Sequence, residues 1–316
     1  MVDDILEILL LLGLAVLFIW LAGRAFRNQR WFVRWPGLIL SGLFALIFLV
    51  LASGATRGLI LLERVHANPP SAIAAATAPE ALARGQEITN GCGCHGVEGQ
   101  PIVSGSRGNL IEGGPPMGIL YTPNLTPGGP LADWSDGEIA RAIREGIGKD
   151  GRALFAMPSV TFHNLSDADT AALIGYLRSL PPTQNSQPAR NMNALADAIV
   201  GFGLFSVSAQ PSITAPVTAP ARAATAEYGK YVASVNTCSD CHGAQLDGVP
   251  SNPFASHGPD LTAIGKAWTA EQFVALFRQG VLPGGAPAPE AMPWKELGPA
   301  LSDTDLQALH AYLGSM

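Results

Sequence analysis

Two long apolar runs open the chain and are the strongest signal in its hydrophobic pattern. Residues Ile5–Ala22 contain a single charged residue, Glu7, and residues Gly37–Thr56 contain none. At ~1.5 Å of rise per helical residue, each run has about the length that crosses the ~30 Å apolar core of a bilayer. The pattern predicts a transmembrane helical hairpin over residues 1–65.

Charges around the two runs predict how the hairpin is oriented. The segment between the runs contains four arginines and no acidic residue: Arg24, Arg27, Arg30 and Arg34. The positive-inside rule places this segment in the cytoplasm and everything after Leu62 on the other side. Two alternatives fit less well. A cleaved signal peptide would need a basic start and a small-residue cleavage site, and a buried core helix would be shorter than the second run.

A repeated pattern of short amphipathic helices follows an Ala/Pro-rich linker at residues 66–79. The two copies span residues 80–182 and 223–316. Each contains, in the same order, a short helical segment, Cys-His-Gly, Pro-Asn/Asp-Leu-Thr, an amphipathic helix that begins at Trp, Met-Pro, and a last helix that begins at Ser. Six landmarks in one order indicate an internal repeat. The predicted fold class is all-α, with a two-helix hairpin followed by two small helical domains.

The two copies are joined by a connector at residues 183–222 that is rich in Pro, Ala, Ser and Asn. It contains the apolar stretch AIVGFGLF, which is too short to span a membrane. We expect this stretch to pack against one of the repeated domains, and a surface for a partner protein is the alternative.

The second copy contains the sequence Cys238-Ser239-Asp240-Cys241-His242, which has the C-x-x-C-H spacing of covalent haem c attachment. Two thiols three positions apart lie on one helical turn and can add to the two vinyl groups of a porphyrin, while His242 is placed under the iron. A bare C-x-x-C could also be a redox dithiol or half of a zinc site. A dithiol does not need the histidine, and a zinc site would need further ligands at matched spacing.

The first copy departs from this spacing, because its cluster is Gly91-Cys92-Gly93-Cys94-His95, or C-x-C-H. The cysteine next to the histidine keeps its place, whereas the other thiol lies one residue too near. The sequence predicts a second covalent haem that is attached through Cys94, with His95 as its iron ligand. Two alternatives stay open: a distorted glycine-rich backbone that lets Cys92 bond as well, or no haem in this copy.

A second iron ligand is expected after each central helix, where Met157 and Met292 occupy matching Met-Pro positions. A thioether sulfur favours Fe(II) and raises the reduction potential. The carbonyls of Pro123 and Pro259 are expected to accept a hydrogen bond from Nδ1 of the axial histidines, which would orient each ring. The rival ligands are His163, His257 and His310. Since His163, His310 and also Met117 have no counterpart in the other copy, we expect ordinary structural roles for them.

Composition and charge narrow the class of protein. Hydrophobic residues make up 48% of the 316 residues and charged residues 14%, as expected for membrane segments joined to soluble domains. All four cysteines lie beside the two histidines, which indicates cofactor attachment and not a disulfide framework. From residue 66 onward there are 13 basic and 21 acidic residues. This balance argues against nucleic acid binding and for redox partners with a basic docking surface.

Both copies resemble class I cytochrome c domains. The first is similar to haem domains in the cytochrome subunits of bacterial membrane-bound alcohol, aldehyde and gluconate dehydrogenases. The resembling residues are YTPNLTP at 121–127, WSDGEIARAIREG at 134–146, DGRALFAMP at 150–158 and LIGYLRSLPP at 173–182. The resemblance implies electron transfer through haem c with His and Met ligands. Those subunits carry three haem domains and this chain carries two. A hairpin followed by two haem domains is also similar to the dihaem subunit of some haem–copper oxidases.

The sequence therefore predicts a membrane-anchored dihaem cytochrome c without substrate chemistry of its own, on the periplasmic (extracytoplasmic) side of the cytoplasmic (inner) membrane. It would be the cytochrome subunit of, or a tethered carrier between, larger respiratory or photosynthetic complexes, including a haem–copper oxidase or a membrane dehydrogenase. A dihaem peroxidase would need an iron with an open or His-supplied sixth position, and the paired Met-Pro motifs argue against it. A haem-free metal or sensor module is the third hypothesis.

Overall fold

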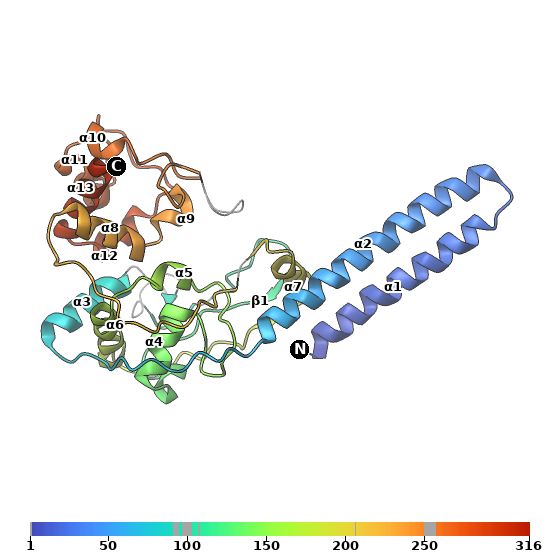
Figure 1. Ribbon diagram of the computed structural model, residues 1–316, viewed down its shortest axis with the longest axis horizontal. Coiled ribbons are helices and arrows are strands. Elements are labelled where there is room, and N and C mark those ends of the chain that lie inside the picture. Colours follow the sequence, from blue (N-terminus) through green and yellow to red (C-terminus); the bar gives the residue numbers. More distant parts are fainter. Residues whose placement is uncertain (1, 91–94, 97–102, 107, 206, 250–256) are drawn as a thin grey trace. The chain divides into compact units, whose positions relative to one another are not determined.

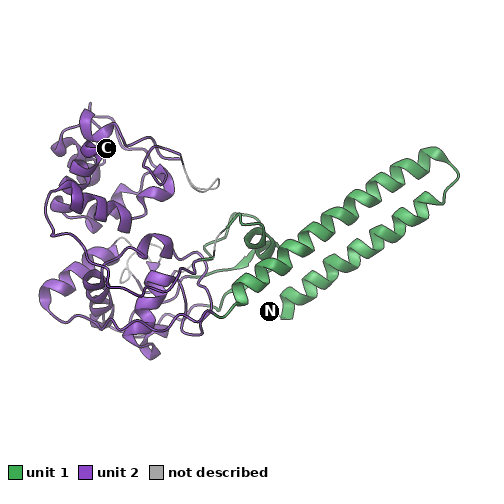
Figure 2. Ribbon diagram, viewed as in Figure 1, with its two compact units in different colours: residues 1–65, 108–121, 188–207 green, residues 66–107, 122–187, 208–316 purple. Residues whose placement is uncertain are grey.

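The structure is a computed structural model that describes residues 2–90, 95–96, 103–106, 108–205, 207–249 and 257–316. The chain forms two compact units (Figure 2). The first consists of residues 1–65, 108–121 and 188–207, and the second of residues 66–107, 122–187 and 208–316. Two short stretches from the repeated region and the connector thus belong to the unit that contains the apolar N-terminal helices.

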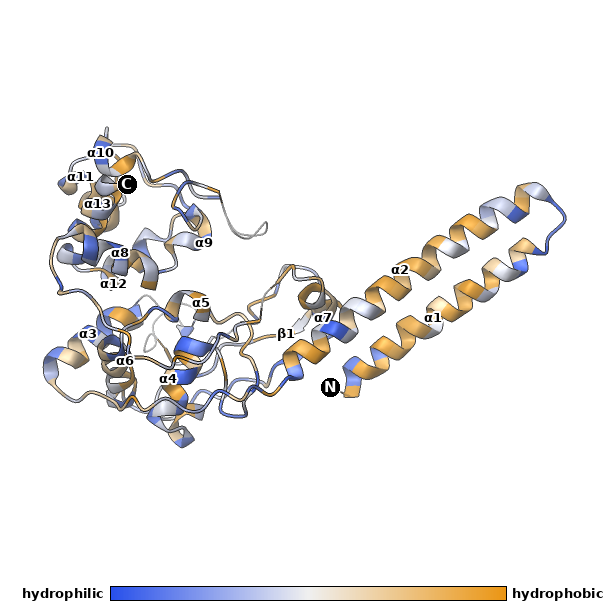
Figure 3. Cartoon of the chain, in the orientation of Figure 1, coloured by the Kyte–Doolittle hydropathy of each residue, from blue (hydrophilic) through white to orange (hydrophobic). Residues whose placement is uncertain are grey.

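Helices α1 (Val2–Phe26) and α2 (Trp31–Glu63) form the predicted hairpin and run antiparallel (Figure 1). They pack through aromatic contacts, with the ring centroid of Phe18 5.0 Å from that of Phe44 and 5.7 Å from that of Phe48. Many of their large apolar side chains are exposed, so apolar residues cover the outside of the hairpin (Figure 3). Both helices are long and apolar enough to cross a membrane.

The second unit contains both repeated domains, and each is a small bundle of helices. The first domain has α3 (Pro79–Asn90), a 3-10 turn (Pro130–Asp133), α4 (Asp136–Glu145), α5 (Ser159–Phe162) and α6 (Asp167–Ser179). The second has α8 (Ala226–Val235), α9 (Cys238–His242), α10 (Ile264–Ala267), α11 (Ala270–Gln279), α12 (Trp294–Ala300) and α13 (Asp303–Ser315). The predicted all-α class is confirmed, with the addition of one small two-stranded sheet in the first unit.

Equivalent residues begin and end the central helix of each domain. Ser135 and Thr269 form capping boxes at the N-termini of α4 and α11, where their hydroxyls accept hydrogen bonds from free backbone NH groups. Gly146 and Gly280 end these helices with φ of 66° and 67°, a left-handed conformation that glycine adopts at little cost. The repeat seen in the sequence is therefore also a repeat of local backbone geometry.

The first and last helices of each domain cross at a glycine. A Cβ atom added to Gly85 of α3 would lie 2.1 Å from the carbonyl oxygen of Ala172 in α6. The same addition at Gly229 of α8 would lie 1.9 Å from the carbonyl oxygen of Ala308 in α13. The helix backbones touch at these points, so only glycine fits. The crossing fixes the helix that leads into the Cys-His motif against the helix that closes the domain.

The apolar stretch of the connector corrects one expectation. Its first four residues form the end of α7 (Ala194–Gly201), which packs against α2 in the first unit, where a repeated domain was expected as the partner. Near it, strands β1 (Gly118–Ile119) and β2 (Asn191–Met192) pair antiparallel. The contact between α7 and α2 is made by small residues that let the two backbones approach closely, and hydrophobic periodicity does not reveal such a contact.

Candidate functional site

The C-x-x-C-H motif of the second domain is a single helical turn, α9. Cys238 and Cys241 are free, partly buried thiols, and their spacing places them on one side of the turn. Burial raises the pKa of the Cys238 thiol to about 11, so it is protonated at neutral pH. Two thiols on one turn followed by an imidazole fit the two vinyl groups and the iron of a haem.

Backbone carbonyls orient both candidate axial histidines. Nδ1 of His242 lies 2.7 Å from the carbonyl oxygen of Pro259, and Nδ1 of His95 lies 3.1 Å from that of Pro123. When Nδ1 donates its proton to the carbonyl, the lone pair on Nε2 is free for a metal ion. Burial lowers the pKa of His95, although the bond to Pro123 acts in the opposite direction, and a low pKa favours the neutral ring that a metal needs.

A glycine that sequence reasoning did not single out makes room for the second histidine ring. A Cβ atom at Gly258 would lie 2.5 Å from Nδ1 of His242. In the second domain a side chain at this position would overlap the ring that bonds the Pro259 carbonyl. The first domain has Thr122 at the corresponding place, so comparison of the two copies gave no signal for this glycine.

The two Met-Pro segments adopt the same backbone turn. The NH group of Ser159 donates to the carbonyl of Met157 at 2.8 Å, and that of Trp294 donates to the carbonyl of Met292 at 2.8 Å. The prolines between them have φ/ψ of −78°/50° and −79°/51°, close to an inverse γ-turn. Both methionines are partly buried at the start of equivalent helices. The geometry makes them equivalent candidates, and their ligation of iron stays a prediction.

Two of the rival histidines are held by backbone carbonyls of their own domains. Nδ1 of His163 lies 3.0 Å from the carbonyl oxygen of Arg144, and Nε2 of His310 lies 2.8 Å from that of Trp268. These contacts agree with the structural roles expected for them. His257 is exposed, and Met117 belongs to the first unit, where its carbonyl accepts a hydrogen bond from Asn193.

The first Cys cluster belongs only in part to the described residues. His95 is described, whereas Cys92 and Cys94 lie outside the described residues. Attachment through Cys94, and the open role of Cys92, therefore stay predictions.

The two repeated domains meet through the same face, so their contacts come in equivalent pairs. Helix α12 packs on α3, and α5 packs on α8. At the first contact Asn90 donates to the carbonyl of Pro299 at 3.3 Å, and at the second Asn164 donates to the carbonyl of Ser234 at 3.4 Å. Since α3 is the counterpart of α8 and α5 that of α12, the interface has approximate two-fold symmetry.

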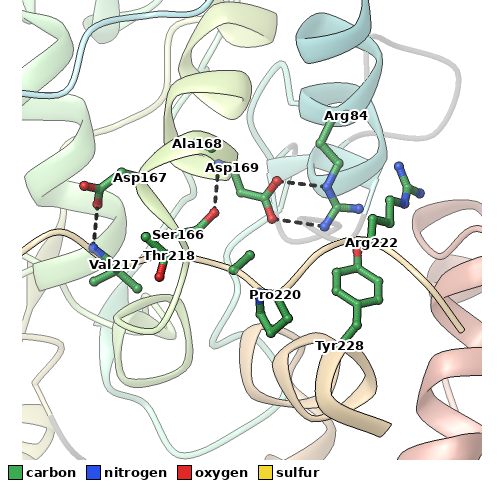
Figure 4. Close-up of a pocket in the computed structure, with 11 residues that line it drawn as sticks. Arg84, Ser166, Asp167, Ala168, Asp169, Val217, Thr218, Pro220, Arg222 and Tyr228 are labelled. Atoms are coloured by element: carbon green, nitrogen blue, oxygen red, sulfur yellow. Dashed lines mark hydrogen bonds and ion pairs between the residues drawn. The ribbon is translucent and has the colours of Figure 1, made fainter. Parts of the chain in front are cut away.

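Arg84 lines a pocket at this interface, together with Asp169 and Tyr228 (Figure 4). Its guanidinium donates two hydrogen bonds to Asp169, at 3.0 and 3.1 Å, and lies 3.7 Å from the carboxylate of Asp305 in the second domain. Burial alone would lower the pKa of Arg84, but these carboxylates raise it, so the charge is kept. The hydroxyl of Tyr231 crosses from the second domain and donates to Asp169 at 2.6 Å. Arg222 adds a second cation, 3.1 Å from Asp305.

Two cavities lie along this interface. The larger, of about 470 Å³, is lined by Arg84, Arg222, Tyr228 and the start of α6 (Figure 4). The lining of the smaller includes Asn236 and Thr237, which directly precede the first cysteine of α9, and Phe162 of α5 in the other domain. Segments next to the candidate cofactor sites of both domains therefore border the interface.

Comparison with known proteins identifies the repeated domains. Residues 82–181 match the cytochrome c family, and residues 222–313 match the family described as cytochrome c oxidase, cbb3-type, subunit III. A nicotinate dehydrogenase subunit from Pseudomonas putida is 30% identical over 266 residues, which cover 74% of this chain and 21% of that protein. The cytochrome c subunits of quinone alcohol dehydrogenase from Gluconacetobacter polyoxogenes and Komagataeibacter europaeus are each 26% identical over 179 residues, or 54% of this chain and 37% of theirs. The chain thus spans well under half the length of these relatives.

Proposed function

Since the chain carries two cytochrome c domains, each with a covalent haem c, we propose that it is the membrane-anchored electron-transfer subunit of a substrate dehydrogenase complex. One domain accepts electrons from the dehydrogenase, passes them to the other domain across their shared interface, and that domain donates them to a further carrier. Electron transfer itself follows from the cytochrome domains and their relatives. The internal path and the complex are the proposal.

The observation that carries the internal path is the approximate two-fold interface that includes Arg84. Residues that precede Cys238 and a residue of the helix that follows Met157 border one cavity there. The hydroxyl of Tyr231 bonds to Asp169 and to the NH group of Ser166 across the interface, and Arg84, held by Asp169 within the first domain, lies 3.7 Å from Asp305 of the second domain. Electron transfer needs a short and constant distance between redox centres, and a fixed interface between the cofactor-bearing segments would supply it.

The side chains of each domain would hold and tune the cofactor in the same way. When bound, haem c supplies an iron that alternates between Fe(III) and Fe(II). His95 and His242 would ligate through Nε2, because their Nδ1 atoms face proline carbonyls. Met157 and Met292 would complete the ligand sets with a soft sulfur that stabilises Fe(II). Such a ligand pair would leave no open coordination position for a substrate such as peroxide.

The printed names of the relatives suggest the class of electron donor. One is a subunit of a nicotinate dehydrogenase and two are cytochrome subunits of alcohol dehydrogenases. We propose a dehydrogenase of small organic substrates as the donor, with the haem domains on the periplasmic side of the inner membrane. The excess of acidic residues from residue 66 onward favours a carrier with a basic docking surface as the acceptor.

Electron exchange within the full-length chain tests the internal path. After photoreduction in detergent, equilibration between the haems should be independent of protein concentration and of viscosity, as expected for fixed domains. Arg84→Glu should slow it roughly tenfold or more, since a carboxylate beside Asp169 and Asp305 adds like-charge repulsion worth several kcal/mol. Arg152→Glu, a matched reversal at an exposed site of the first domain, should leave the rate unchanged.

The control on cofactor binding is the absorption spectrum, which must show both haems in every variant. An Arg84→Glu chain that equilibrates as fast as the native chain would contradict the internal path. The complex is tested separately in native membranes, where deletion of the gene should stop haem reduction by the dehydrogenase substrate. Unchanged reduction would exclude the proposed donor class but leave the internal path standing.

A further inference from the structure

The two cytochrome domains differ most in length between the Cys-His-Gly sequence and the proline of the Pro-Asn/Asp-Leu-Thr sequence, and many of the extra residues belong to the other unit. In the sequence, Gly96 and Pro123 are 27 positions apart, whereas Gly243 and Pro259 are 16 apart. Residues 108–121 of the longer stretch belong to the unit of the N-terminal helices, together with residues 188–207 of the connector. We call these two segments the collar. They have no counterpart in the second domain, so haem binding does not require them.

Hydrogen bonds within the collar hold its two segments together. Strands β1 and β2 pair, with Gly118 opposite Met192. The side chain of Asn193 donates to the carbonyl of Pro116 at 2.6 Å, and that of Asn109 donates to the carbonyl of Gly118 at 2.9 Å. Two segments that are distant in the sequence therefore form one small structure.

The collar is attached to both helices of the hairpin. A Cβ atom at Gly201 would lie 1.9 Å from the carbonyl oxygen of Gly54, so α7 and α2 touch. Arg57 donates to the carbonyl of Gly201 at 2.8 Å. On α1, the carboxylate of Glu7 accepts a hydrogen bond from the NH group of Ala194 at 2.6 Å, at the N-terminus of α7.

These attachment points mark the end of the apolar part of the hairpin. In α2 the 22 residues between Arg34 and Arg57 are uncharged, a helix length of ~33 Å that matches the ~30 Å apolar core of a bilayer. In α1 the last acidic residue before the apolar run is Glu7. The ring of Phe202 lies over Gly54, about one turn from Arg57 toward the uncharged run. The collar thus lies at the level where a spanning hairpin leaves the bilayer.

Exposed apolar side chains are concentrated in the collar. Among the described residues beyond Glu63, nine large hydrophobic side chains are exposed, and five of them belong to the collar: Leu110, Ile119, Leu195, Phe202 and Leu204. Their exposed fractions lie between 38% and 44%. The collar is a small part of that region, so this is a strong bias.

We infer that the collar is a lipid-binding surface that rests in the outer interfacial layer of the bilayer, where its apolar side chains contact the upper acyl chains and Arg57 lies at the level of the phosphates. This inference rests on the proposed membrane anchor. Lipid is the occupant because the neighbouring surface of the hairpin is itself exposed and apolar, and because the collar is attached at Glu7 and Arg57, the charged residues that bound the two apolar runs at this end. Apolar side chains at this depth add binding free energy in proportion to the area they bury.

Photo-crosslinking to lipid tests the inference with the full-length chain in its native membrane. The photoreactive residue p-benzoylphenylalanine is placed at Phe202, at Leu46 in the middle of α2, or at Val160, which is exposed in the first cytochrome domain. Mass spectrometry should find lipid adducts at positions 46 and 202. Position 202 should give roughly tenfold or more lipid than position 160, because the collar would be immersed in the bilayer and the surface of the cytochrome domain would not.

Each other outcome has a separate meaning. No lipid at position 46 would refute the membrane anchor itself. Lipid at 46 but none at 202 would overturn the collar inference and leave the anchor in place. Adducts of position 202 with another protein would show that a membrane-embedded partner subunit, and not lipid, covers the collar. Haem spectra of all three variants must match the native chain.

Discussion

His95 and His242 each face a proline carbonyl through Nδ1, and the Met-Pro turns are superimposable in their backbone angles. Agreement at this level is more informative than either domain alone, because a single Met beside a loop could be ordinary core packing. The residue that differs is the first cysteine of the cluster, where the spacing changes from C-x-x-C to C-x-C. Both features lead to predictions about individual side chains.

Met292→His is expected to lower the reduction potential of the second haem by at least ~100 mV, since imidazole lacks the preference of a thioether for Fe(II). A redox titration followed by absorption measures the shift, and Met157→His tests the first haem. Met117→His is the control, because Met117 belongs to the first unit and should leave both potentials unchanged. An unchanged potential in Met292→His would mean that another side chain is the ligand.

Cys92→Ala should leave the covalent haem content of the first domain intact, whereas Cys94→Ala should abolish it. Cys94 adjoins His95 as Cys241 adjoins His242, and Cys92 starts one residue too near to reach the other vinyl group from a helical turn. Mass spectrometry of the haem peptide counts the thioether bonds. Two bonds in the native peptide would show that the glycines on both sides of Cys92 let the backbone stretch.

Helix crossings and helix faces decide how the cytochrome domains are built. Gly85 and Gly229 both lie in the first helix of their domain, and each lets a backbone carbonyl of the last helix approach. Next to them, Arg84 and Tyr231 extend to the neighbouring domain, and the last helices supply Asp169 and Asp305 from equivalent positions. One helix pair thus serves both the domain core and the domain interface.

Gly229→Ala should destabilise the second domain by about 1–3 kcal/mol, because the added methyl group would overlap the carbonyl of Ala308 and force the helices apart. Denaturant unfolding followed by the Soret band measures the loss. Ser234→Ala, further along the same helix, should change stability by less than ~0.5 kcal/mol. Equal effects of the two substitutions would argue against a close helix crossing.

Tyr231→Phe and Tyr228→Phe should separate the interface from the domain core. The hydroxyl of Tyr231 donates to Asp169 and accepts from the NH group of Ser166 at 3.1 Å, both across the interface, whereas that of Tyr228 donates to Asp305 within its own domain at 2.8 Å. Loss of one hydrogen bond costs ~1 kcal/mol, or roughly a fivefold change in an equilibrium, and Tyr231→Phe removes two of them from the interface. Amide exchange in α5 and α12 should therefore rise roughly fivefold or more in Tyr231→Phe only. A similar rise in both variants would mean that the interface does not depend on these bonds.

At the level of the whole molecule, the hairpin, the collar and the haem domains have separate tasks. Arginines between α1 and α2, and acidic residues at the start of α1, give the hairpin a charge asymmetry that predicts its orientation. The haem domains follow α2 in the sequence, so their side of the membrane depends on that orientation.

Reporter fusions test this topology. A fusion at Met316 should report an extracytoplasmic location and one within Asn28–Gln29 a cytoplasmic location, because the arginine-rich segment stays inside. Reporters active in only one compartment give the readout. The same location for both sites would refute the hairpin, while opposite locations in the reverse sense would contradict the positive-inside argument.

The sequence alone determined the features that depend on neighbouring residues. Apolar runs predict membrane helices through their length, and the repeated landmarks together with Cys238, Cys241 and His242 indicate two cytochrome c domains. The family matches confirm the domains, and the helical fold class is confirmed with one small sheet added. These signals are local, since helix formation and thioether chemistry act over a few adjacent positions.

Only the tertiary structure decided which distant segments meet. The apolar stretch of the connector was expected to pack on a cytochrome domain, but α7, which contains the first half of that stretch, contacts α2 through glycines that produce no hydrophobic periodicity. No sequence motif contains Gly258, Arg84 or Tyr231. The role of each depends on a residue elsewhere in the chain: His242 for Gly258, Asp305 for Arg84 and Asp169 for Tyr231. A side chain that acts through a long-range contact is recognisable only when its partner is known, because its own neighbours in sequence are the same with or without that contact.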